Sequence, residues 1–112
     1  MAEITKASLT QYGVDSFTPV ELTGTDTLAS TAKQGTLFIY NTTAGSVNVV
    51  IDGDGGATVD TPTAGPVDVS GGFTAACAVD EITKVNLGNI AGYLSGDVDV
   101  TGGASGVFAW VL

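Results

Sequence analysis

The side chains of this chain that could do chemistry are mainly carboxylates, and two of them open a loop typical of calcium sites. Asp52-Gly53-Asp54 matches the start of an EF-hand loop. The twelfth loop position, where an EF-hand has glutamate, is Thr63, so the EF-hand interpretation fails. A looser calcium site that includes Asp60 is one alternative, and a tight acidic turn is the other, because Asp and Gly suit turn geometry. We predict the turn, with no metal ligand.

A second pair of carboxylates, Asp97 and Asp99, has the spacing of a catalytic pair. Their side chains share one face of a predicted strand and lie about 6.5–7 Å apart along it, within the range of glycosidase carboxylates. Alternation along a strand also places polar side chains outward for solubility alone, and a small sheet offers little cleft. We therefore predict no catalytic residue here.

Cys77 is the only cysteine, so an intrachain disulfide is excluded. It lies among small apolar residues in 73–79, and no basic residue is near it in sequence to stabilise a thiolate. A buried structural thiol is therefore predicted. The glycine-rich segments 70–72 and 102–103 lack the lysine and the helix of a phosphate loop, and they predict turns.

The residue types that are missing limit the function further. The chain has no histidine, the commonest general base and metal ligand near neutral pH, and its three basic residues are all lysines. We predict that the protein is not an enzyme and needs no cofactor. Its formal net charge of −9 argues against binding to nucleic acid or to anionic membrane surfaces, which select basic patches. A structural or binding module remains.

Length and composition indicate one small domain. The 112 residues divide into an N-terminal arm or edge segment, 1–18, and a single β domain, 19–112. Only 13% of residues are charged and the mean hydropathy is +0.35, which excludes a disordered chain. Either sister subunits or a partner shield part of the surface, or the domain has a Thr/Ser/Gly surface. Without a signal peptide or an apolar span, we expect synthesis in the cytoplasm.

The elements that must position these residues are short strands. Residues 46–52 alternate, with Val47, Val49 and Ile51 on one face, and residues 83–87 and 97–101 alternate similarly. Residues 23–34 predict a surface connection with one brief strand near Leu28, and residues 88–94 a short helical turn. The other strand-like segments are 20–22, 36–41, 58–59, 67–69, 73–79 and 107–112. Seven to nine short strands predict an all-β fold, a small sandwich or barrel.

The last strand is apolar on both faces. Phe108, Trp110 and Leu112 share one face of residues 107–112, and smaller apolar residues share the other. Such a strand is either central in a sandwich or part of a subunit interface. Residues 36–41, which include Tyr40, are also apolar on both faces and predict a strand covered on both sides. The candidate interface residues are therefore Phe108, Trp110, Leu112 and Tyr40.

Residues 35–112 resemble, in the order and texture of their segments, the small capsid decoration (cement) proteins of tailed bacteriophages. The segments are Leu37-Phe38-Ile39-Tyr40-Asn41, Val47-Asn48-Val49, Val67-Asp68-Val69-Ser70-Gly71-Gly72-Phe73, Val85-Asn86-Leu87, Asp97-Val98-Asp99-Val100-Thr101-Gly102 and a hydrophobic C-terminal strand. The resemblance implies a β-rich virion protein, often trimeric, that binds the outer face of an assembled head and braces neighbouring capsomers. It transfers no functional residue to this chain.

From this resemblance we expect a virion structural protein whose partners are the major capsid protein and other copies of itself, with a trimer favoured. Its location would be the outer capsid surface. Two alternatives stay open. One is another virion component, from the tail, neck or fibre. The other is a carbohydrate- or ligand-binding β-sandwich, with Trp110 or Tyr93 as a stacking platform.

Overall fold

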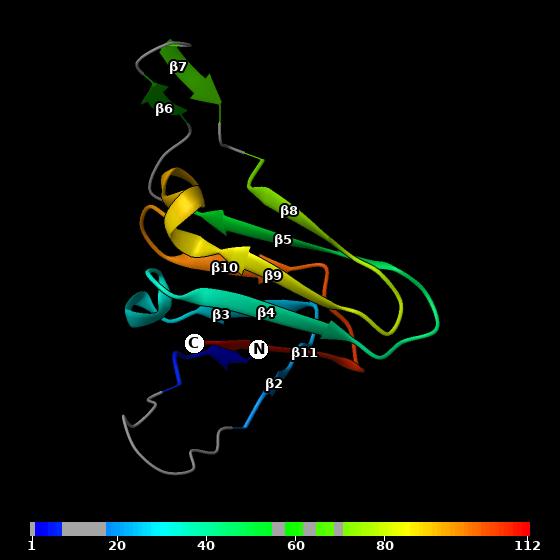
Figure 1. The fold of residues 1–112 in the computed structure, drawn as a ribbon. Coiled ribbons are helices and arrows are strands. Elements are labelled where there is room, and N and C mark those ends of the chain that lie inside the picture. The colour runs from blue at the N-terminus through cyan, green and yellow to red at the C-terminus, as the bar shows by residue number, and fades with distance from the viewer. Residues whose placement is uncertain (1, 8–17, 55–57, 62–64, 69–70) are drawn as a thin grey trace.

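The computed structural model of the chain is a β-sandwich of two sheets (Figure 1). It describes residues 2–7, 18–54, 58–61, 65–68 and 71–112, and for 58–61 and 65–68 it describes the backbone alone. The predicted all-β class is confirmed, and of the two predicted architectures the sandwich is correct. The nine strands of the two sheets agree with the expected number.

Sheet A has five strands and sheet B has four. Across sheet A the order is β1 (Glu3–Ile4), β3 (Thr25–Leu28), β10 (Val98–Thr101), β5 (Val47–Gly53) and β8 (Phe73–Cys77). Across sheet B the order is β2 (Val20–Glu21), β11 (Val107–Val111), β4 (Thr36–Asn41) and β9 (Ile82–Asn86). β6 (Thr58–Thr61) and β7 (Gly65–Asp68) form a separate two-stranded sheet. Two 3₁₀ helices are also present, η1 (Ser30–Ala32) and η2 (Leu87–Tyr93).

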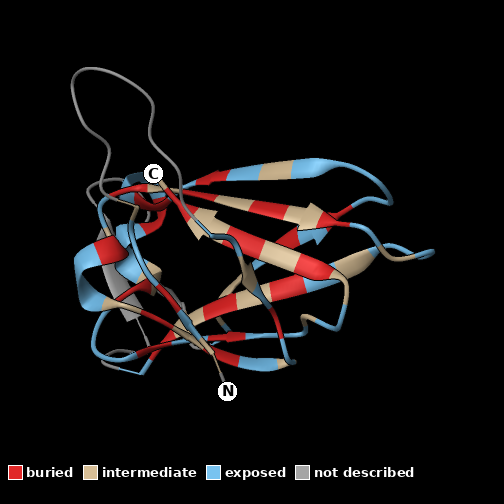
Figure 2. Ribbon diagram, turned by 90° about the horizontal axis from the view of Figure 1, so that it is seen from below, coloured by how far each residue is buried: buried red, intermediate tan, exposed pale blue. Residues whose placement is uncertain are grey.

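The core lies between the two sheets, and Figure 2 shows buried and less buried residues alternating along the strands that enclose it. Along β5, Val49 and Ile51 are fully buried, as the alternation of residues 46–52 predicts. The largest fully buried apolar side chains are Ile4, Leu22, Leu37, Ile39, Val49, Ile51, Leu87, Val98, Val100, Val107 and Val111. At roughly 1.5–3 kcal/mol for each large side chain, this burial is the main stabilising contribution to the sandwich.

The N-terminal segment contributes a strand to the edge of sheet A. Glu3 and Ile4 pair in parallel with Thr27 and Leu28, and the Ile4 side chain is fully buried. Lys6 forms a bridge to Val111 in the other sheet, so this segment spans both layers. The rest of the predicted arm, residues 8–17, lies outside the described residues, and the division of the chain at residue 18 stays a prediction.

Residues 23–34 contain the brief strand that the sequence predicts near Leu28, but three residues of this predicted surface connection are buried. The segment contains β3, with Asp26 and Leu28 buried, and η1, with Ala32 buried. The correction has a physical reason. The Asp26 carboxylate meets donors from Ala2 and Thr23, and this hydrogen bonding allows a charged side chain to face the interior.

Two turns depend on glycine where a side chain has no room. Gly102, after β10, has φ +85°, and a Cβ there would lie 2.3 Å from the backbone oxygen of Asn48. Gly53, at the end of β5, would place a Cβ 2.4 Å from the backbone oxygen of Ser95. The glycines therefore let the ends of β5 and β10 approach neighbouring backbone.

The predicted short helical turn at residues 88–94 is confirmed as η2. The Asn86 side chain accepts a hydrogen bond from the Gly88 N–H at its start. Within the part of the chain that the structure describes, neither 3₁₀ helix has the length and hydrophobicity that crossing a bilayer requires.

Candidate functional site

The outer surface of sheet B is unusually rich in large apolar side chains. We call it the aromatic face, defined by Phe38, Tyr40, Ile82, Phe108, Trp110 and Leu112. In β11, Val107, Ala109 and Val111 are fully buried, whereas Phe108 and Trp110 are half-buried. Since successive residues of a strand point to opposite sides, the larger side chains lie on the outside of the sandwich and the smaller ones inside.

Strand pairing sets these side chains in two rows across sheet B. One row pairs Phe108 with Tyr40 and Tyr40 with Ile82. The next row pairs Trp110 with Phe38, whose rings stack with centroids 5.7 Å apart and an interplanar angle of 11°. Directly opposed aromatic side chains stabilise a strand pair by roughly 0.2–1 kcal/mol. The aromatic face is thus a fixed surface, held by the pairing of the two central strands.

Polar groups border this face. Lys84, exposed on β9, continues the row of Phe38 and Trp110. Glu21 stands opposite Phe108 on β2, and its carboxylate accepts hydrogen bonds from the Gly106 N–H, at 3.0 Å, and the Ser105 hydroxyl, at 3.4 Å. A cavity of about 100 Å³, lined in part by Val20, lies beside Trp110. The arrangement has an apolar centre and a polar rim, as protein interfaces do.

The structure brings the four sequence-predicted interface residues together. Tyr40, Phe108 and Trp110 lie on the aromatic face, and Leu112 continues it because its backbone N–H and C=O pair with Thr36 beyond the end of β11. None of the four belongs to the core, so the central-strand explanation applies only to the inner side of β11. The prediction that residues 36–41 are covered on both sides is wrong, because Phe38 and Tyr40 are only half-buried.

Sequence reasoning missed Ile82, which is 57% exposed and continues the row of Tyr40. The predicted strand began at residue 83, one position late. Alternation with Lys84 would have placed Ile82 on the outer side.

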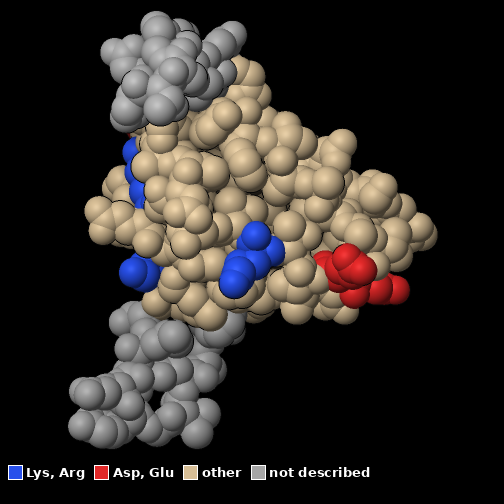
Figure 3. Space-filling view, turned by 45° about the horizontal axis from the view of Figure 1, so that its top comes forward, with Lys and Arg blue, Asp and Glu red and all other residues tan. Residues whose placement is uncertain are grey.

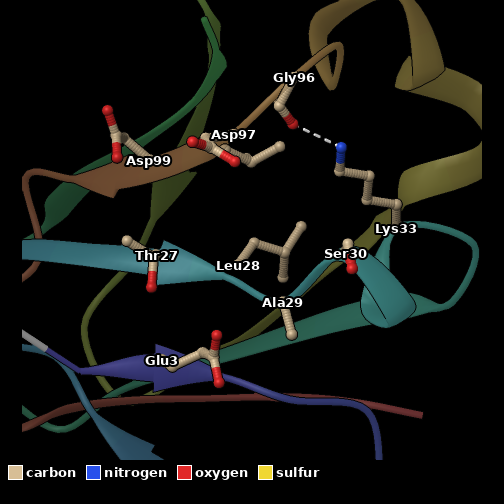
Figure 4. A pocket seen from close by; sticks show the side chains of 10 residues that line it. Glu3, Thr27, Leu28, Ala29, Ser30, Lys33, Gly96, Asp97 and Asp99 are labelled. Atoms are coloured by element: carbon tan, nitrogen blue, oxygen red, sulfur yellow. Dashed lines mark hydrogen bonds between the residues drawn. The ribbon is translucent and has the colours of Figure 1, made fainter.

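The outer surface of sheet A is acidic. Glu3, Asp97 and Asp99 line a pocket of about 440 Å³, at whose rim the Lys33 ammonium donates to the Gly96 carbonyl (Figure 4). Both aspartates are exposed, so the pair that the sequence singled out lies at an open pocket. Among the residues that the structure describes, no three histidine, cysteine or acidic side chains are arranged to hold a metal ion.

In the turn after β5, the Asp54 carboxylate forms a structural hydrogen bond. The Asp54 side chain accepts from the Asp97 N–H at 2.9 Å, and the Asp54 N–H donates to the Asp97 carbonyl, also at 2.9 Å. These bonds join the end of β5 to the start of β10. The side chain of Asp60 and residue Thr63 lie outside the described part of the chain.

Cys77 is buried at the end of β8, as predicted. Burial raises the pKa of its thiol, with a smaller opposing effect of a hydrogen bond involving Thr83. A buried thiol with a raised pKa is a poor nucleophile. The geometry therefore fits a structural cysteine.

We expect the two aspartates that face each other on sheet A to destabilise the fold. Asp99 pairs directly with Asp52 in the antiparallel ladder, with like charges on one surface. Asp99→Asn should raise the free energy of unfolding by about 0.2–1 kcal/mol at low ionic strength, and the gain should shrink as salt screens the pair. Urea denaturation at low and high salt measures both effects. Glu81→Gln, which removes the same charge from a turn, is the control; an equal gain there would show that only net charge matters.

A scan against models of protein families, a search of curated proteins and a search of solved structures each found no match to this chain.

Proposed function

We propose that this protein is a non-catalytic structural component of a phage virion, a decoration protein that docks on the outer surface of the head. The observation that carries the proposal is the aromatic face. Burial of aromatic side chains is the main source of hot-spot energy in protein interfaces, and hot spots are enriched in Trp and Tyr. A rigid sheet surface that presents them pays little conformational entropy on docking.

The charge distribution supports a protein partner on the head exterior. A chain of net charge −9 would be repelled by packaged DNA at the inner surface. Three lysines leave little scope for salt bridges to capsid carboxylates, so apolar contacts and backbone hydrogen bonds would carry most of the docking. Bridging between capsomers would then stabilise the head without chemistry, and self-association, with a trimer favoured, belongs to the same proposal.

In the carbohydrate-binding alternative, Tyr93 is less suited than Trp110 to stack against a sugar. Tyr93 packs edge-on against Phe73, with ring centroids 5.8 Å apart, and both rings lie against the core. Trp110 remains as a platform, although it is stacked on Phe38. Binding to immobilised sugars in the absence of heads would favour this alternative.

The experiment adds purified protein to heads that lack it, followed by imaging and by heating of the decorated heads. We expect density on the outer surface and a higher temperature of head disruption. Tyr40→Thr combined with Phe108→Thr should weaken docking by about 30-fold or more, because one hot-spot truncation costs about 2 kcal/mol or more and the two losses need not add. Threonine keeps the β-propensity of both strands.

The matched control is Val50→Thr, a half-buried residue on the outer side of sheet A. It should leave docking unchanged. Density on the tail alone would assign the protein to the other virion components, and bare heads after incubation with wild-type protein would contradict the proposal.

A further inference from the structure

The turn that joins the two sheets carries an unusual combination of side chains. We call residues 79–82 the tip turn; it leads from β8 of sheet A into β9 of sheet B (Figure 1). Among the described residues, the two large hydrophobic side chains that are exposed both belong to it, Val79 at 40% and Ile82 at 57%. Asp80 and Glu81 lie between them, and both are exposed. An apolar pair thus flanks an acidic pair.

Hydrogen bonds to the end of β4 support the backbone of the tip turn. Asp80 has φ +57°, and it is the only described residue other than glycine with a positive φ. This strained backbone is fixed from outside the turn: the Asp80 N–H donates to the Asn41 carbonyl at 2.8 Å, and the Asn41 N–H donates to the Glu81 carbonyl at 3.2 Å. Strained residues of this kind persist where surrounding structure over-determines them, and they gather at functional positions. A turn already rigid before binding loses little entropy on docking.

Covering the exposed valine and isoleucine side chains with a partner would lower the free energy of the complex. The two adjacent carboxylates favour a partner surface of positive charge. On the face that Figure 3 shows, the acidic side chains lie toward the end where β8 runs into β9, and the basic ones lie away from it. A second copy of this chain is a poor source of positive charge, because it has three lysines that lie far apart in the sequence, at positions 6, 33 and 84.

We propose that the tip turn is a docking knob that inserts Val79 and Ile82 into an apolar pocket of the capsid protein, rimmed by lysine or arginine that contacts Asp80 and Glu81. This inference rests on the proposed function and names the chemistry of its partner. Ile82 belongs both to the tip turn and to the aromatic face, so the knob extends the same docking surface to the end of the molecule.

The test measures binding of labelled protein to heads that lack it, by co-sedimentation across a range of concentrations. The apolar variant is Val79→Ser with Ile82→Thr, and we expect its affinity to fall by about tenfold or more. The charge variant is Asp80→Asn with Glu81→Gln; asparagine tolerates the positive φ of Asp80. We expect its binding to weaken by about three- to tenfold at low salt and to lose part of its salt dependence.

The matched control, Asp97→Asn with Asp99→Asn, removes the same two charges from the acidic surface of sheet A and should bind like wild type. Sedimentation velocity of each variant alone shows whether it is folded and whether its self-association has changed. If wild type fails to bind heads, the proposed function is wrong, and this inference with it.

If wild type binds and both tip variants bind equally well, the proposed function stands and the knob is wrong. Loss of binding in the apolar variant alone would contradict the basic rim. Loss of self-association with unchanged head binding would make the occupant a second copy and would also overturn the proposal.

Discussion

Replacing Asp26 by alanine should lower the free energy of unfolding by about 3 kcal/mol, and the melting temperature by more than about 10 °C. The Asp26 side chain is fully buried on β3. Its carboxylate accepts from the Ala2 N–H at 3.0 Å, the Thr23 N–H at 2.9 Å and the Thr23 hydroxyl at 2.8 Å. Alanine would remove the acceptor from these partly buried donors, of which the Thr23 hydroxyl keeps another, the Thr25 carbonyl at 3.1 Å, and an unsatisfied donor costs about 1–3 kcal/mol when it is buried.

The same carboxylate makes stability depend on pH. Burial by itself would raise the pKa of Asp26, but the hydrogen bonds from Thr23, Ala2 and Gly24 outweigh it and hold the pKa below its ordinary value of 3.8. A lowered folded-state pKa stabilises the protein above the unfolded-state pKa, and this stabilisation is lost as the pH falls through the folded-state pKa. Wild type should therefore lose its advantage over Asp26→Asn as the pH falls below about 4.

Thermal and urea unfolding of wild type, Asp26→Ala and Asp26→Asn at several pH values measure these effects. Thr25→Ala, an exposed position on the same strand, is the control and should cost less than about 1 kcal/mol. Faster amide exchange at β1 in the Asp26 variants would show that the Ala2 contact holds the N-terminal strand in place. A loss no larger than that of Thr25→Ala would mean that the hydrogen-bonded carboxylate contributes little.

Asn41→Asp should be at least as damaging, at about 3–5 kcal/mol near neutral pH. The Asn41 amide is fully buried; its NH₂ donates to the Gly45 carbonyl at 2.9 Å and to the Cys77 carbonyl at 3.1 Å. Aspartate has the same shape but would set a charged oxygen against two carbonyl oxygens. The loss relative to wild type should shrink in acid, where a protonated carboxyl regains one donor.

Thr43→Ala is the graded control for this site. The side-chain oxygen of Asn41, Oδ1, accepts hydrogen bonds from the Thr43 hydroxyl at 2.6 Å and from the Thr43 N–H at 2.9 Å. One acceptor contact therefore survives, and we expect a cost of about 1 kcal/mol. Denaturation curves measure the loss of unfolding free energy in both variants, and amide exchange at the tip turn measures local opening. Equal losses would show that the amide donors have no special role.

Asn41 also links stability to the docking proposal. Its backbone fixes Asp80 and Glu81, and its side chain ties the loop after β4 to the end of β8. A substitution that destabilises the surroundings of Asn41 should therefore also destabilise the tip turn. The buried Asn41 therefore supports both the conformation of the tip turn and the stability of this end of the sandwich.

Much of the local structure was predictable because successive side chains of a strand point to opposite faces, and this alternation is visible in the sequence. The alternation of residues 46–52 anticipated which side of β5 is buried, and Phe108, Trp110 and Leu112 were correctly placed on one side of the last strand. The isolated Cys77 in an apolar segment predicted a buried thiol. The expected absence of catalysis and cofactors, by contrast, stays a prediction from composition.

The tertiary structure alone decided which strands are neighbours and which side of β11 faces out. Where both faces of a strand are apolar, as in β11, a period of two does not say which face meets the core; here the smaller side chains are inside, because Val107, Ala109 and Val111 fit between two closely packed sheets. Asp26 and Asn41 are polar residues that a sequence places on the surface. Nearby residues supply part of their hydrogen bonding, Thr23 for Asp26 and Gly45 for Asn41, and folding completes it with partners from distant residues, Ala2 for one and Cys77 for the other. Such pairings depend on closure of the whole sandwich, and no local pattern contains them.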